Sequence, residues 1–75
     1  MNFGDTVALL VNAEGYSMSD QDICLTRGLV GTVIEAMNSD VVIVEFAGID
    51  GVAYAIGSIA CGNLLPLHHA PSASD

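Results

Sequence analysis

The sequence predicts an all-β domain. Short runs of apolar, β-branched residues recur along the chain, and clusters rich in glycine, asparagine and aspartate separate them. Such runs are typical of strands, and such clusters are typical of the turns between strands. The chain has 75 residues, which is enough for one domain and too few for two.

Five strands are expected, at residues 6–11, 29–37, 41–47, 52–59 and 64–67. The connections at 38–40 and 48–51 consist of residues that accept turn geometry, so the three middle strands should form consecutive hairpins. Residues 61–63 should form a turn with a single 3₁₀ step. Pro66 has no main-chain N–H to donate, so the last strand should lie at a sheet edge.

Residues 12–26 are predicted to form a long loop. Glycine, serine and aspartate are mixed there with scattered large apolar side chains, and neither a strand period nor a helix period is visible. Long loops in small domains are usually functional or disordered. We therefore expect this segment to provide a partner-binding surface, made of Tyr16, Met18, Asp20 and Asp22.

Five short strands, a long first loop and three hairpin-linked strands together predict a small five-stranded SH3-like barrel, with the long loop between strands one and two. One domain should span residues 1–67, and the small, polar residues 68–75 should form a flexible tail. Tight bends in such a barrel require glycine, which tolerates positive φ and close approach of the backbone. The glycines expected at structural turns are Gly28, Gly31 and Gly51.

The strands at 41–47 and 52–59 carry apolar side chains on both of their faces. A five-stranded barrel has only one inside, and large exposed apolar patches are uncommon on monomers. We therefore expect a homo-oligomer whose interface contains Val41, Ile43, Ala53 and Ala55. The alternative is that the long loop or the C-terminal tail folds over the same face.

The chain carries nine acidic side chains and a single basic one, Arg27, which gives a formal charge of −8. Binding to nucleic acid or anionic lipid needs clustered lysine and arginine, so neither a nucleic acid nor a membrane is an expected partner. The acidity suits either solubility or a basic protein partner. No apolar run approaches the roughly 20 residues of a membrane helix, and no signal peptide is visible, so a cytoplasmic location is expected.

No set of residues matches a catalytic, cofactor or metal site, so neither an enzyme nor a bound cofactor is expected. Cys24 and Cys61 do not form a C-x-x-C pair, and we expect both to be buried free thiols, because cytoplasmic proteins keep thiols reduced. His68 and His69 are neighbours, and neighbouring side chains of an extended segment seldom bind one metal ion together.

Two acidic patterns are also weak signals for chemistry. The stretch from Asp20 to Asp22 resembles the opening of a calcium-binding loop but lacks the glycine and terminal glutamate that complete one. Glu35 and Glu45 lie on neighbouring predicted strands, where paired carboxylates can perform acid–base catalysis. Two solvated side chains are the default interpretation of that pair.

Four segments resemble a known family, namely F-G-D-T-V-A-L-L, R-G-L-V-G-T-V, V-V-I-V-E-F and L-L-P-L. Together they are similar to a family of small uncharacterised bacterial proteins with an SH3-like barrel, and the resemblance covers residues 3–67. The barrel type is similar to KOW domains and to the β-subunit of nitrile hydratase. The G-x-x-G-x-V turn of KOW domains resembles the stretch from Gly28 to Val33. The resemblance implies a fold and no established activity.

These observations favour a non-enzymatic protein-interaction module that self-associates through an apolar strand face and uses its acidic loop for a partner. One alternative is a KOW-like domain associated with RNA or the ribosome, which the resemblance implies and the single arginine disfavours. The other is a small metal-dependent accessory protein or enzyme that uses the two cysteines and the two histidines.

Overall fold

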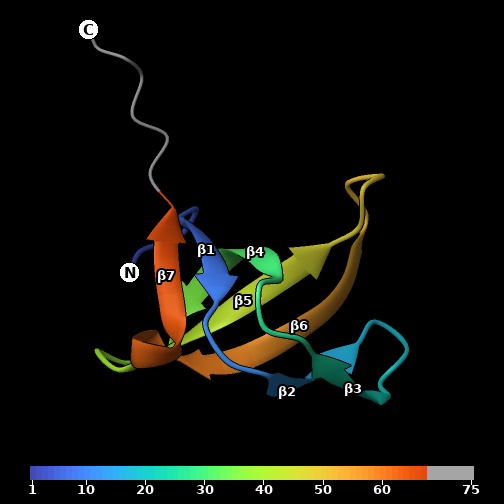
Figure 1. The fold of residues 1–75 in the computed structure, drawn as a ribbon, viewed down its shortest axis with the longest axis horizontal. Coiled ribbons are helices and arrows are strands. Elements are labelled where there is room, and N and C mark those ends of the chain that lie inside the picture. The colour runs from blue at the N-terminus through green and yellow to red at the C-terminus, as the bar shows by residue number, and fades with distance from the viewer. Residues whose placement is uncertain (68–75) are drawn as a thin grey trace, which may run out of the picture.

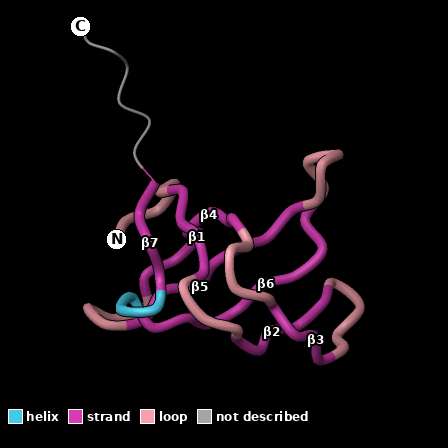
Figure 2. The backbone as a smooth tube through the Cα atoms, in the orientation of Figure 1, coloured by secondary structure: helices cyan, strands magenta, loops and turns pink. Residues whose placement is uncertain are grey.

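The computed structural model describes residues 1–67, which form one antiparallel sheet of seven strands in the order β3-β2-β6-β5-β4-β1-β7 (Figure 1). The strands are β1 (Thr6–Leu9), β2 (Ala13–Ser17), β3 (Asp22–Leu25), β4 (Val30–Ala36), β5 (Val41–Ala47), β6 (Ala53–Ala60) and β7 (Leu64–Leu67). One 3₁₀ turn at Cys61–Asn63 joins β6 to β7 (Figure 2). Residues 1–67 contain no α-helix. The flexible tail predicted at 68–75 lies outside the described residues.

All five predicted strands are present. Those at 41–47 and 64–67 have the predicted bounds, and the other three differ at their ends by one or two residues. The 3₁₀ step at Cys61–Asn63 is also confirmed. The edge position predicted from Pro66 is correct, because β7 is the last strand of the sheet and pairs only with β1.

The prediction of a long loop at 12–26 is wrong, because that segment contains the hairpin of β2 and β3. The hairpin turns tightly: the Ser17 C=O accepts from the Asp20 N–H at 3.0 Å, and the Ser17 N–H donates to the Gln21 C=O at 2.8 Å. Asp20 has a φ of 62°, which aspartate tolerates better than most residues and which suits the left-handed position of a short hairpin connection. Serine and aspartate therefore mark a turn here rather than a loop.

The predicted barrel closure is also wrong. β3 and β7 lie at opposite ends of the strand order and do not pair with each other, so the sheet stays open. The two unpredicted strands account for this, because β2 pairs with β6 and continues the sheet at a position where the prediction had no strand. The buried side chains nevertheless form one cluster with members from every strand except β2. A single sheet can do this only if it curves, with one face turned inward.

Glycine allows the β2–β3 hairpin to lie close to the rest of the sheet. A Cβ atom at Gly15 would lie 2.5 Å from the Ile56 carbonyl oxygen and 2.7 Å from Leu25 Cδ1, and one at Gly57 would lie 3.0 Å from the same Leu25 atom. Leu25 has no exposed surface. The missing side chains at the two glycines thus leave the space that Leu25 fills, and this contact attaches β3 to the core.

The three glycines predicted at structural turns fall into two groups. Gly28 and Gly51 lie in the connections before β4 and β6 and have φ values of 93° and 79°. Gly31 lies within β4 rather than in a turn. A Cβ atom there would lie 2.6 Å from Val44 Cγ1 and 2.8 Å from the Glu45 carbonyl oxygen. Close approach of β5, and not a bend, is what requires glycine at this position.

We expect Gly31→Ala to lower the free energy of unfolding by about 1–3 kcal/mol, because the added methyl group overpacks the contact with β5. The measurement is urea denaturation followed by circular dichroism. Gly62→Ala is the matched control, since a Cβ at Gly62 meets nothing within 4 Å. Equal stabilities of the two variants would show that the approach of β5 does not exclude a side chain at Gly31.

Candidate interaction surfaces

The outer face of the sheet carries an apolar patch on its central strand. The register aligns Tyr16 of β2, Ile56 of β6 and Glu45 of β5 in one row on this face. Val41 and Ile43 precede Glu45 on β5 at alternate positions, so their side chains share the same face. Both are half-buried, whereas the intervening residues of β5 are buried in the core. The prediction that 41–47 is apolar on both faces therefore describes a real outward surface.

Met37 extends this surface across the strand. It follows the end of β4, and its Sδ accepts a hydrogen bond from the Ser58 Oγ of β6 at 3.6 Å. Ser58 is opposite Ile43, and β5 lies between β4 and β6. The Met37 side chain therefore reaches over the outer face of β5. We call Met37, Val41, Ile43 and Ile56 the β5 patch.

Ala55 does not belong to this surface, contrary to the predicted interface. It has no exposed surface and lies opposite Phe46 in the core. The prediction assigned Ala53 and Ala55 to the outward interface, but Ala55 is turned inward, where the bulk of Phe46 needs a small residue beside it. Ala53 is opposite Ala47 and is half-buried. A shift in the β5–β6 register lies between this pair and the pair of Phe46 with Ala55.

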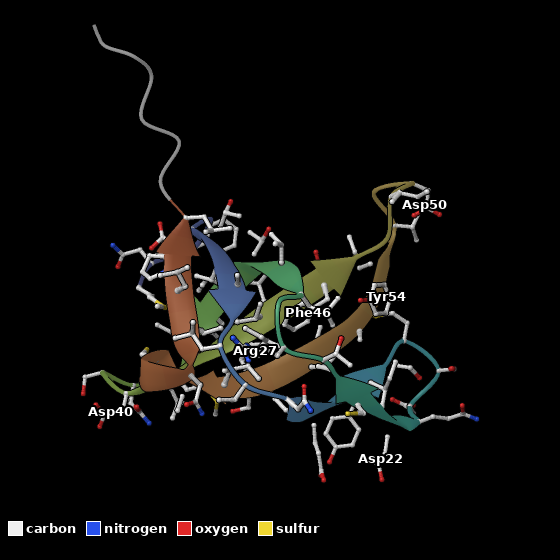
Figure 3. All side chains as sticks on the ribbon, viewed as in Figure 1. Asp22, Arg27, Asp40, Phe46, Asp50 and Tyr54 are labelled. Carbon is white, nitrogen blue, oxygen red and sulfur yellow. The ribbon has the colours of Figure 1, made fainter. Side chains whose placement is uncertain are left out.

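The residues predicted for a partner loop lie on the β2–β3 hairpin instead. Tyr16 and Asp22 are opposite each other on the two strands, and Met18 and Asp20 lie in the connection between them. Asp22 is on the hairpin at the periphery of the molecule, while Phe46 is inside it (Figure 3). All four predicted residues are exposed, so the surface exists as strand and turn.

The free edge of this hairpin borders a surface recess that the sequence did not reveal. The recess has a volume of about 240 Å³ and is lined by Glu14, Asp22, Ile23 and Cys24. Glu14 and Cys24 are opposite each other in the register, which puts both on the outer face with Asp22. No pattern in the sequence could indicate this recess, because it depends on β2 pairing with β3.

The candidate residues for chemistry do not assemble into a site in the part of the chain that the structure describes. Cys24 and Cys61 are free, and the expectation of burial is wrong for Cys24, which is exposed on the edge strand, while Cys61 is half-buried. Among residues 1–67 no group of three metal-ligating side chains is close enough to hold an ion. His68 and His69 lie outside this range.

Glu35 and Glu45 are on the outer face of adjacent strands but are not opposite each other. Glu35 pairs with Ile43 and Glu45 pairs with Thr32, so the two carboxylates are offset by two positions on β5. Both belong to the border of the β5 patch. Their arrangement adds negative charge to this border and forms no enclosed catalytic pair.

The structure thus defines an all-β domain made of one open antiparallel sheet, with its candidate surfaces on the outer face and at the β3 edge. The chain belongs to the family described as Domain of unknown function (DUF4926), whose model matches residues 4–66. No curated protein and no solved structure matches the chain. Within residues 1–67, no helix is long and apolar enough to cross a membrane.

The two thiols should differ in reactivity in the folded protein. We expect an aromatic disulfide reagent to modify Cys24 first, because it is exposed while Cys61 is half-buried. The measurement is the time course of thiol modification, in which Cys24→Ser should remove the fast phase and Cys61→Ser the slow one. Urea-unfolded protein should show a single rate. Two equal rates in the native protein would contradict the burial of Cys61.

Proposed function

We propose that the protein is a non-enzymatic interaction module that self-associates through the β5 patch. The observation that carries this proposal is the outward placement of Val41 and Ile43 on β5, with the Met37 side chain reaching across this strand to Ser58 of β6. When a partner removes apolar side chains of this size from water, their burial stabilises the complex.

The position of the β2–β3 hairpin supports this proposal over the alternative that the segment 12–26 covers the patch. The hairpin continues the sheet beside β6, so it does not lie over the outer face of β5. A second copy of the chain offers the same apolar surface, as a two-fold symmetric interface requires. The β2–β3 hairpin is therefore not the element that covers the β5 patch.

Charge predicts how salt should affect self-association. Each copy has a formal charge of −8, and Glu35 and Glu45 border the patch. Two copies therefore repel each other at low ionic strength, and added salt screens this repulsion. The association should become tighter as salt rises. A KOW-like role with RNA has less support, since Arg27 is the one basic side chain available for phosphate.

We expect Ile43→Lys to convert the oligomer into a monomer, because a charged group would replace the apolar centre of the patch. Lysine suits the strand, since Glu35 lies directly opposite and provides a cross-strand partner. The measurement is molar mass by size exclusion with multi-angle light scattering, at low and high salt.

Ile49→Lys is the matched control, with the same substitution at a fully exposed position in the turn between β5 and β6. This variant should keep the mass of the wild type. A wild-type protein that is monomeric at every concentration and salt level would refute self-association. An oligomer unaffected by Ile43→Lys would refute the patch as its interface.

A further inference from the structure

We propose that the free edge of β3 binds an extended, basic segment of another protein, which adds to the sheet as a further strand. The inference deepens the role of interaction module and names the partner chemistry. It does not depend on self-association through the β5 patch, because it uses a different part of the sheet.

The main-chain geometry of the hairpin shows that β3 has unused hydrogen-bonding groups. In an antiparallel sheet the residues of one strand alternate between its two neighbours. The Met18 N–H donates to the Tyr54 C=O of β6, and the Ser17 N–H donates to the Gln21 C=O. Even-numbered residues of β2 therefore face β6, and odd-numbered residues face β3. On β3 the pairing residues are then odd-numbered, which leaves the N–H and C=O groups of Asp22 and Cys24 pointing away from the sheet.

The opposite edge of the sheet, formed by β7, lacks a main-chain donor at its centre, so it is less suited than the β3 edge to bind a further strand. The Leu9 N–H donates to the Leu29 C=O beside β4, so the odd-numbered residues of β1 face β4. Pro66 is opposite Val7 and therefore turns its main-chain nitrogen to the free edge of β7. Proline has no N–H there, and such residues commonly protect edge strands from pairing. β3 contains neither proline nor lysine, two residues that commonly protect edge strands.

The side chains on β3 select the sequence of the added strand. Asp22 and Cys24 point to the outer face together with Glu14, and Ile23 points to the inner face and is half-buried. Residues of the partner opposite Asp22 and Cys24 would share the outer face. Lysine or arginine at these positions would lie near the carboxylates of Asp22 and Glu14. The partner residue opposite Ile23 would be apolar. The expected pattern is basic, apolar, basic.

Charge favours a basic partner at this edge over a second copy of the chain. A second β3 strand would bring Asp22 and Glu14 of one copy close to the same acidic residues of the other. Like charges on adjacent strands are destabilising. A basic segment instead neutralises these carboxylates, and Asp20 in the adjoining connection adds a further negative charge.

The test uses a labelled, capped peptide that alternates lysine and valine, with binding measured by fluorescence anisotropy. The protein is the full-length Ile43→Lys variant, so that self-association and peptide binding are separated. We expect saturable binding that weakens as salt rises, opposite to the salt effect on self-association. Methylation of the lysine main-chain nitrogens keeps every charge and removes the donors to β3, and it should weaken binding about tenfold.

Two protein variants test the same contact. Cys24→Pro removes the outward N–H without touching the pairing between β2 and β3, and it should also weaken binding about tenfold. Asp22→Asn should weaken binding about fivefold and reduce its dependence on salt. Asp40→Asn is the matched control, with the same change of charge in the turn before β5 at a distant end of the sheet (Figure 3). It should bind within about twofold of the unmodified protein.

Three outcomes would overturn the proposal. The first is the absence of saturable binding to the alternating peptide. The second is equal binding of the methylated peptide, which would mean that charge alone holds the ligand. The third is an oligomer of the wild-type chain that Cys24→Pro dissociates and Ile43→Lys does not, which would assign the β3 edge to a second copy. The first two leave self-association through the β5 patch untouched, so the two proposals can fail separately.

Discussion

The fold depends on how Phe46 is accommodated at the centre of the sheet. It is the largest fully buried side chain, and the register places Gly31 on one side of it and Ala55 on the other. Its ring needs the space that these two small residues leave. A slip of one residue in either pairing would replace a small neighbour by a larger one and would turn core side chains outward. The central strands are therefore aligned by a match of size.

The elements that the sequence predicted well are those with a local signal. Alternating β-branched runs and turn residues identify β4, β5 and β6, and the missing N–H of Pro66 identifies an edge. The β2–β3 hairpin has a weak local signal, because Gly15 interrupts one strand and resembles a turn residue. Its glycine is required by Leu25 and by the carbonyl group of Ile56. Such contacts join residues far apart in the chain, so no local pattern could indicate the extra strands or the open sheet.

The candidate surfaces likewise divide into those with a local sequence signal and those that depend on contacts between distant residues. Strand periodicity alone was sufficient to place Val41 and Ile43 on the outward side of a buried strand. The faces of β6 could not be assigned in this way, since Ala55 is inward only because Phe46 lies beside it. The exposure of Cys24 and the recess at the β3 edge likewise depend on a strand pairing that the sequence signalled weakly.

The two edges of the sheet differ, and this difference limits how far strands can be added. A sheet with two open edges can stack end to end without limit, as the sheets of fibrils do. Here Pro66 leaves the β7 edge without a donor at its centre, whereas the β3 edge presents the N–H and C=O groups of Asp22 and Cys24. Addition of one strand at β3 leaves the β7 edge unchanged. End-to-end stacking of copies would require a β3 edge to pair with a β7 edge, and the missing N–H of Pro66 disfavours that pairing.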